Sequence, residues 1–95
     1  MYGVFIEVNA DESHVEAARE FLPRAAVPMA RESGATAGFW LAPLGGRGVS
    51  VVVFNTEAEA HAVADHFEVG KPPGPGAPEG VTVRTVEVRE VLASV

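Results

Sequence analysis

The sequence predicts an α+β protein whose elements follow the order β-α-β-β-α-β, with a four-stranded antiparallel sheet and two helices on one face. Three observations support this prediction. Apolar residues alternate with a period of two near both ends of the chain, a glycine-rich turn joins two apolar runs in the middle, and segments with helical apolar spacing flank that hairpin. The 95 residues suit one domain, residues 1–95, and leave no room for a second core.

Residues 2–8 form the first predicted strand, because their side chains alternate between two faces. One face carries Tyr2, Val4, Ile6 and Val8, and the other carries Phe5 and Glu7. Asn9 and Asp11 follow with capping oxygens for a helix, and Glu12 adds a favourable charge in its first turn.

The first predicted helix has an apolar stripe made of Val15, Ala18, Leu22, Ala25, Ala26 and Met29. Pro23 and Pro28 lie inside this pattern, and an interior proline costs roughly 3 kcal/mol because it removes a hydrogen bond and clashes with the preceding turn. We therefore expect one long helix that bends or breaks near Pro28. It should end at about residues 33–34, where a glycine suits the C-terminal cap.

A β-hairpin is predicted from strands at residues 36–42 and 49–55, because Gly45-Gly46 tolerates the positive φ angles of a tight turn. A turn closed at these glycines pairs Leu44 with Arg47, Ala42 with Val49 and Trp40 with Val51. A slip of one residue would give Trp40 another partner.

A second helix, a loop and a last strand complete the chain. Thr56 and Glu59 fit a capping box for a helix that ends near Gly70, with a buried face of Ala60, Val63, Ala64 and Phe67. Residues 71–80, KPPGPGAPEG, predict an extended surface loop. The last strand covers residues 81–91, and its alternation changes phase near Arg84-Thr85, which indicates a bulge. This order of elements is the ferredoxin-like arrangement.

Both faces of the predicted sheet are apolar. In the third strand Val49, Val51 and Val53 lie opposite Val52 and Phe54. Two helices can cover one face, whereas the exposed face of an antiparallel sheet is usually polar. We therefore expect a second copy of the chain to cover the other face, which makes a twofold homodimer. The alternative is a monomer with an unusually apolar sheet.

The chain resembles the dimeric α/β-barrel superfamily, and within it the small proteins similar to antibiotic-biosynthesis monooxygenases. Three segments carry the resemblance: the proline-broken first helix ending in SGATAGFW, the hairpin into GRGVSVVVFNTEAEA, and the terminal VTVRTVEVREV strand. The resemblance implies two sheets packed face to face and a possible pocket between each sheet and its helices. It also implies a possible cofactor-independent monooxygenase-like enzyme acting on an aromatic or polyketide-like molecule. The alternatives are a non-catalytic protein that binds an apolar ligand, and a structural or interaction dimer.

Four residues are candidates for ligand contact. Trp40 is suited to an aromatic ligand, although packing in the core or the dimer interface is the favoured interpretation. Asn9 and His61 are candidates because haem-degrading members of the superfamily use an asparagine and a histidine in similar places. Helix capping is favoured for Asn9, and an exposed position is favoured for both His61 and His66.

Glu7 is a candidate base, because a half-buried carboxylate can have a raised pKa, although an ion pair with Arg84 or Arg89 is the favoured interpretation. His14 and Asp11 could form a dyad, but no motif places a nucleophile beside them, and a solvated polar face is favoured. The catalytic residues stay unknown, and no cofactor or metal site is expected.

Composition excludes several classes of function. The net charge is -6, from 13 acidic and 7 basic residues, so binding to nucleic acid is not expected. No cysteine is present, which removes disulfides and thiolate chemistry. The start of the chain does not resemble a signal peptide, and no apolar run is long enough to span a membrane. We expect a cytoplasmic protein whose partners are a second copy of itself and, where a pocket exists, an apolar small molecule.

Overall fold

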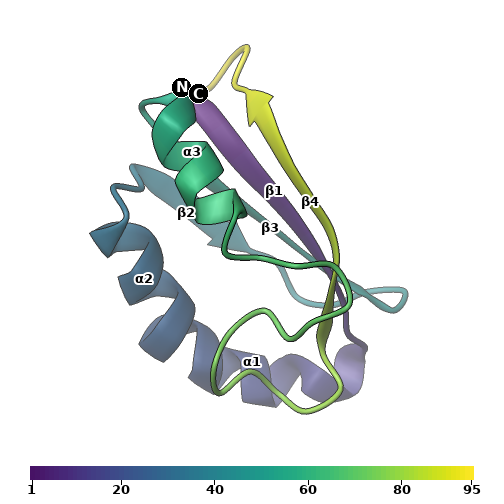
Figure 1. Cartoon of the computed structure of the whole chain (residues 1–95). Coiled ribbons are helices and arrows are strands. Elements are labelled where there is room, and N and C mark those ends of the chain that lie inside the picture. The colour runs from purple at the N-terminus through teal and green to yellow at the C-terminus, as the bar shows by residue number, and fades with distance from the viewer.

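The structure is a computed structural model that describes residues 1–95. Its four strands form one sheet in the order β2-β3-β1-β4, and all neighbouring strands are antiparallel. The strands are β1 (Tyr2–Asn9), β2 (Ala37–Trp40), β3 (Arg47–Phe54) and β4 (Thr82–Glu90). The helices lie on one face of this sheet (Figure 1). The ferredoxin-like fold is therefore confirmed.

The first helical segment begins with a capping box at Asp11. The Asp11 side chain accepts a hydrogen bond from the Ser13 N–H at 2.9 Å, and the His14 Nδ1 accepts one from the Asp11 N–H at 3.1 Å. Asn9 does not cap this helix, contrary to the favoured interpretation, because it still belongs to β1. Its side-chain amide instead donates to the Thr82 hydroxyl at 3.2 Å.

The same segment is irregular along its length. It consists of a 3₁₀ turn η1 (Glu12–His14), helix α1 (Val15–Phe21), a π-helical turn η2 (Leu22–Ala26) and helix α2 (Val27–Glu32). The expected disturbance near Pro28 lies just upstream, in η2, where the Val27 N–H bonds to the Leu22 carbonyl. The wider π turn precedes Pro28, whose ring would clash with the carbonyl four residues back in a regular helix. Gly34 follows with φ 96°, as expected of a C-terminal glycine.

The hairpin register differs by one residue from the predicted one. Leu44 pairs with Arg47 as expected, but Trp40 lies opposite Ser50 and not opposite Val51. Between these two pairs, the chain from Trp40 to Leu44 has one residue more than the opposite chain from Arg47 to Ser50. The extra residue lies around Pro43, which has no N–H for a regular ladder, so β2 ends at Trp40.

The second half of the fold starts at helix α3 (Glu57–Ala64), whose capping box between Thr56 and Glu59 is confirmed. The helix ends at Ala64, earlier than the predicted end near Gly70, and the Phe67 N–H bonds to the Ala64 carbonyl in the turn that follows. The predicted bulge in β4 is confirmed, because the pairing with β1 shifts by one residue at Arg84.

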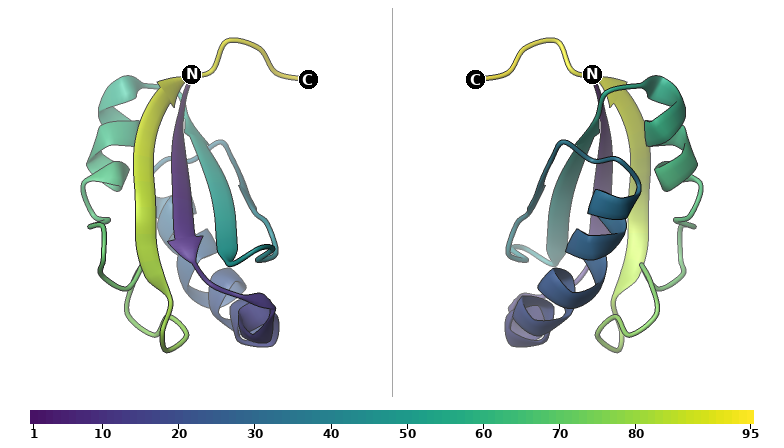
Figure 2. Two further views of the ribbon diagram at one scale, coloured as in Figure 1. Left: turned by 90° about the vertical axis from the view of Figure 1, so that its right-hand side faces the viewer. Right: turned by 90° about the vertical axis from the view of Figure 1, so that its left-hand side faces the viewer.

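The two helical layers sit differently on the sheet. Helix α3 packs directly on β1, β3 and β4, and α2 reaches the core with Ala30, whereas α1 stands away from the strands (Figures 1 and 2). The core between α3, α2 and the sheet consists of Val4, Ile6, Ala30, Val52, Phe54, Ala60 and Val63. No residue of η1, α1 or η2 is buried. A space therefore separates this part of the first helical segment from the sheet.

The opposite face of the sheet has no helix on it, and Figure 2 shows the strands from this side in its left view. Phe39, which pairs with Val51, is 67% exposed on this face. Val51 is also exposed, and Phe5 and Val53 are half-buried. Both sheet faces therefore carry apolar side chains as expected, and the open face also carries charged ones.

Candidate functional site

A pocket with a cavity volume of about 200 Å³ lies between the helix-side face of the sheet and the first helical segment. Of the 25 residues that line it, 17 are hydrophobic. The sheet contributes Ile6, Val8, Trp40, Gly48, Ser50 and Val52, and the first helical segment contributes Ala18, Phe21, Leu22, Ala25, Ala26 and Met29. The third wall comes from Phe67 and the proline-rich segment that follows α3.

Small residues keep this pocket open. The helical wall carries four alanines, at positions 18, 25, 26 and 30, whose side chains are too short to fill the space between the helix and the sheet. Gly48 lies in the floor, where a Cβ atom would be only 3.0 Å from Cγ2 of Val8. A larger residue at position 48 would therefore push Val8 aside or reduce the pocket.

Trp40 is the largest aromatic residue in the lining. It is half-buried, lines the pocket and packs against the core cluster. Its role in packing and its position beside the pocket are therefore compatible, because one side chain does both.

Ser50 is the most buried polar residue of the pocket, with an exposed fraction of 8%. It lies on the helix-side face of β3, opposite Trp40 in β2 and Ile6 in β1. The side-chain hydrogen bonds of the structure do not include its hydroxyl, and no polar side-chain atom that is completely shielded lacks a partner. The Ser50 hydroxyl therefore reaches the space of the pocket.

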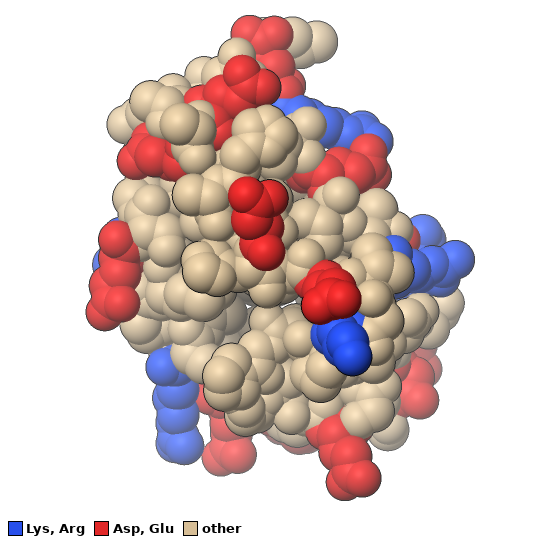
Figure 3. All heavy atoms as spheres, in the orientation of Figure 1, with Lys and Arg blue, Asp and Glu red and all other residues tan.

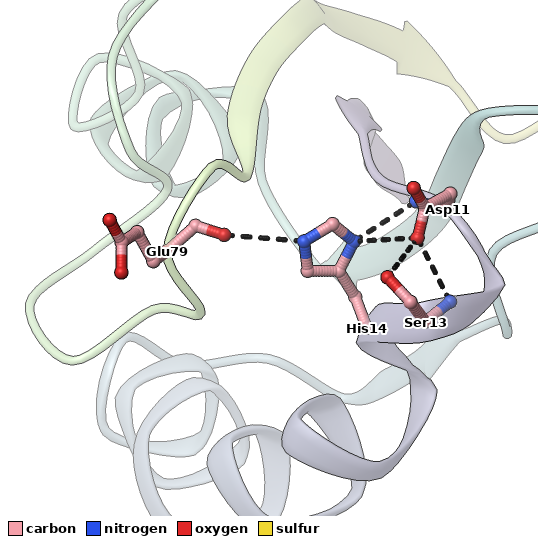
Figure 4. Close-up of polar contacts among 4 residues, drawn as sticks. All are labelled: Asp11, Ser13, His14 and Glu79. Atoms are coloured by element: carbon pink, nitrogen blue, oxygen red, sulfur yellow. Dashed lines mark hydrogen bonds and ion pairs between the residues drawn. The ribbon is translucent and has the colours of Figure 1, made fainter.

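His14 lines the pocket and also contacts the proline-rich segment through Glu79 (Figure 4). Its Nδ1 accepts from the Asp11 N–H at 3.1 Å and lies 3.2 Å from Asp11 Oδ1, and its Nε2 lies 3.2 Å from the Glu79 carbonyl oxygen. Because Nδ1 accepts in this arrangement, the neutral ring carries its proton on Nε2 and donates it to Glu79. Both nitrogens are thus occupied, and His14 is not on a solvated polar face as the sequence suggested.

Asp11 is exposed and its charge is stabilised by its neighbours. Hydrogen bonds from the Ser13 side chain and then from the Ser13 backbone N–H lower the pKa of Asp11, with a smaller contribution from His14. This carboxylate supports the capping box and the orientation of His14, and it does not line the pocket.

The segment of residues 71–80, here called the strap, covers one side of the pocket. Pro73, Gly74, Pro75 and Pro78 line the cavity, and a Cβ atom on Gly76 would be 3.8 Å from the Phe21 ring. The Val83 N–H bonds to the Lys71 carbonyl at one end of the strap. Further along, the contact between His14 and Glu79 connects the strap to the first helical segment.

Of the four candidates from the sequence, only Trp40 lines the pocket. Glu7 lies on the opposite sheet face, and Asn9 bonds to Thr82 at the end of β1. His61 is exposed on α3, where its Nε2 lies 3.4 Å from the Glu57 carboxylate. No three histidine, aspartate and glutamate side chains lie close enough together to hold a metal ion, and no helix is long and apolar enough to cross a membrane.

Glu7 takes part in a charge cluster on the open face of the sheet. Its side chain is 10% exposed and lies 2.8 Å from Arg47 Nη1 and 3.7 Å from Arg84 Nε. The Thr85 hydroxyl donates to its other oxygen at 3.1 Å. The expected ion pair with Arg84 is present, whereas Arg89 pairs with Glu87 instead. The closer partner, Arg47, was not foreseen because the pairing of β1 with β3 decides it.

Sequence reasoning missed Ser50 and the strap as parts of the pocket. A signal was available for Ser50, which is the single polar residue in the apolar run 49–54. No comparable signal marked the strap, because a proline-rich loop looks the same in sequence whether or not it covers a cavity.

No protein-family model matches the chain, and no curated protein matches it. Among solved structures, the fold is similar to that of the NE2512 protein of unknown function from Nitrosomonas europaea. The TM-score is 0.62, with 23% sequence identity over 99% of this chain and 91% of that chain. A likeness at this level of identity shows a shared fold and does not assign an activity.

Proposed function

We propose that the protein is a homodimer that binds a small, neutral, largely apolar molecule in the pocket between the sheet and its first helical segment. The observation that carries this proposal is an open apolar cavity in a chain of only 95 residues. Protein interiors of this size are usually close-packed, and voids larger than a few water molecules are uncommon. An open cavity lowers stability, so its presence favours a binding role.

The volume of the pocket limits the size of the ligand. A dry engineered cavity of about 150 Å³ holds benzene, and pockets for drug-sized molecules are about 300–1,000 Å³. A cavity of about 200 Å³ lies between these values. The expected ligand is therefore a molecule of one ring, or of one ring with a short substituent.

The chemistry of the lining limits the charge of the ligand. No lysine, arginine, aspartate or glutamate lines the pocket, and His14 is its single titratable side chain. A charged ligand would lose its hydration without gaining an opposite charge, which costs several kcal/mol or more. A neutral ligand avoids this cost.

The non-catalytic role is favoured over the monooxygenase-like role suggested by the resemblance. A cofactor-independent oxygenation needs a base that removes a proton from the substrate. Glu7 lies on the other face of the sheet, and both nitrogens of His14 are engaged with Asp11 and Glu79. No side chain of the pocket is thus free to act as that base.

Native mass spectrometry of freshly purified protein, followed by titration with ethylbenzene, tests the binding role. We expect a retained neutral ligand or saturable binding of ethylbenzene, detected as a change in the fluorescence of Trp40, the single tryptophan of the chain. Ala25→Phe should fill the pocket and abolish the response, whereas Ala58→Phe, at an exposed position of α3, should leave it intact. A protein that carries no ligand and does not respond to ethylbenzene would contradict the proposal.

The second part of the proposal concerns the open face of the sheet. Phe39 and Val51 are exposed there, and a second copy would remove them from water. Charge also favours this face, which carries Arg47, Arg84, Arg89, Glu7 and Glu87. These three positive and two negative groups give it a formal charge of about +1, against -6 for the whole chain, so two copies meet here with the least repulsion.

The side of the molecule drawn in Figure 3 is less suited to self-association. This view, which has α3 in front, shows acidic side chains spread over the surface, with basic side chains scattered among them and no continuous basic area. Pairing through the open faces would place two sheets face to face, as the resemblance to dimeric α/β barrels implies.

Sedimentation velocity of the purified protein and of Val51→Glu tests the dimer. We expect a dimer for the unmodified chain and a monomer for Val51→Glu, because the substitution places two carboxylates in the centre of the apolar interface. Val69→Glu is the matched control, since Val69 is exposed and lies outside the sheet. A monomeric unmodified protein would contradict this part of the proposal and leave the pocket unaffected.

A further inference from the structure

We propose that Ser50 is the recognition group of the pocket and that the ligand is an apolar molecule with one uncharged hydrogen-bonding group, a hydroxyl or a carbonyl. This inference rests on the proposed function, because it names the chemical class of the molecule that the pocket binds.

The first step concerns the free-energy cost of leaving the Ser50 hydroxyl without a hydrogen bond. A hydroxyl that leaves water without gaining a hydrogen bond costs roughly 1–3 kcal/mol. Ser50 is 8% exposed, and its hydroxyl opens into the pocket without a side-chain hydrogen bond. A ligand that fills the pocket without a matching polar group would leave this hydroxyl unpaired, at the cost given above. Its neighbours on the same sheet face are apolar, with Ile6 opposite in β1 and Trp40 opposite in β2. Alanine would fill this position at lower cost if packing were the single requirement.

The second step concerns the other polar groups of the pocket. His14 uses one nitrogen for Asp11 and the other for Glu79, so it offers the ligand no free donor or acceptor. The Trp40 indole N–H can donate but cannot accept. Ser50 is thus the one residue of the lining whose side chain can both donate a hydrogen bond to a ligand carbonyl and accept one from a ligand hydroxyl.

The third step concerns specificity. An apolar wall distinguishes ligands weakly by shape, whereas a buried group that needs a hydrogen bond discriminates against ligands that lack the matching atom. One such group in an otherwise apolar lining selects molecules with one polar substituent. Ligands with several polar groups would leave the additional groups unsatisfied.

The test compares ethylbenzene with benzyl alcohol, which have the same shape and differ by a terminal methyl or hydroxyl group. Their dissociation constants are measured by titration calorimetry on the unmodified protein, on Ser50→Ala and on Ser33→Ala. Ser33 is the matched control, because its hydroxyl donates to the Met29 carbonyl at the end of α2 and it does not line the pocket. Circular dichroism confirms that each variant is folded.

We expect Ser50→Ala to shift the ratio of the two dissociation constants about three- to tenfold in favour of ethylbenzene, as the loss of one hydrogen bond implies. Ser33→Ala should leave the ratio unchanged. An unchanged ratio in Ser50→Ala, with both ligands still binding, would overturn the role of Ser50 and leave the proposed pocket standing. If neither ligand binds the unmodified protein, the proposed function itself is overturned, and the assignment of Ser50 with it.

Discussion

The indole of Trp40 lies against Gly38, two residues earlier on the same face of β2. A Cβ atom built on Gly38 would be 3.1 Å from Cη2 and 3.2 Å from Cζ3 of the indole. These distances are shorter than ordinary van der Waals contact, so the ring occupies space that a side chain at position 38 would need. The glycine thereby lets Trp40 lie along the strand at the edge of the pocket.

Replacing this glycine should displace the tryptophan. We expect Gly38→Val to lower the free energy of unfolding by about 1–3 kcal/mol, because added methyl groups force the ring out of its position. Chemical denaturation measures the stability, and the emission maximum of Trp40 reports its environment. Gly74→Val is the matched control, since a Cβ atom there would have nothing within 4 Å. An unchanged emission spectrum in Gly38→Val would contradict the packing of Trp40 on Gly38.

The contact between His14 and Glu79 predicts how firmly the strap is held. In His14→Ala, we expect the Ala77 and Val81 amides, which are bonded within the strap segment, to exchange with deuterium up to about tenfold faster. The Val83 amide should be less affected, because it belongs to the end joined to Lys71.

Ser13→Ala is the control for this measurement. It removes the Ser13 hydroxyl from Asp11 and so disturbs the same cap, but it does not touch Glu79. Equal acceleration in His14→Ala and Ser13→Ala would show that the cap, and not the contact with Glu79, holds the strap.

The lowered pKa of Asp11 predicts a dependence of stability on pH. Because the ordinary pKa of 3.8 is lowered in the folded protein, chiefly by the Ser13 hydrogen bonds, the charged carboxylate contributes stability above that value. This contribution is lost as the pH falls through the lowered pKa. The difference in unfolding free energy between the unmodified protein and Asp11→Asn should therefore be largest above about pH 4 and shrink at lower pH. A difference that does not vary with pH would exclude this origin.

The ion pair between Glu7 and Arg47 should matter more for stability than those on the surface. We expect Arg47→Ala to lower the free energy of unfolding by about 1–2 kcal/mol, because the nearly buried carboxylate loses its closer partner and keeps Arg84 at 3.7 Å. Arg19→Ala breaks an exposed pair with Glu16 and should change stability by less than about 0.5 kcal/mol. Denaturation at two protein concentrations separates this effect from dimerisation. Equal stabilities of the two variants would contradict it.

The elements of the fold could be predicted from local chemistry. The alternation of Val4, Phe5 and Ile6, the capping box of Thr56 and the glycine turn at 45–46 each depend on residues close in sequence. The predicted register of Trp40 was wrong by one residue. Both sheet faces carry apolar side chains, so the alternating pattern fits either register, and the irregular segment near Pro43 determines which one forms.

The sequence by itself determined the element order, the two apolar faces of the sheet and the places where helices begin. These follow from side-chain period, capping groups and glycine geometry, which act over a few residues. Only the tertiary structure decided that η1, α1 and η2 stand away from the sheet while α3 packs on it, and that the strap covers one side of the pocket that results. The alanines of the first helical segment are compatible both with close packing and with a cavity. An apolar stripe indicates which side of a helix faces the sheet, but it does not indicate the distance between the helix and the sheet. The partners of Ser50, His14 and Glu7 depend on strand register and helix placement, which are set by the packing of the whole chain.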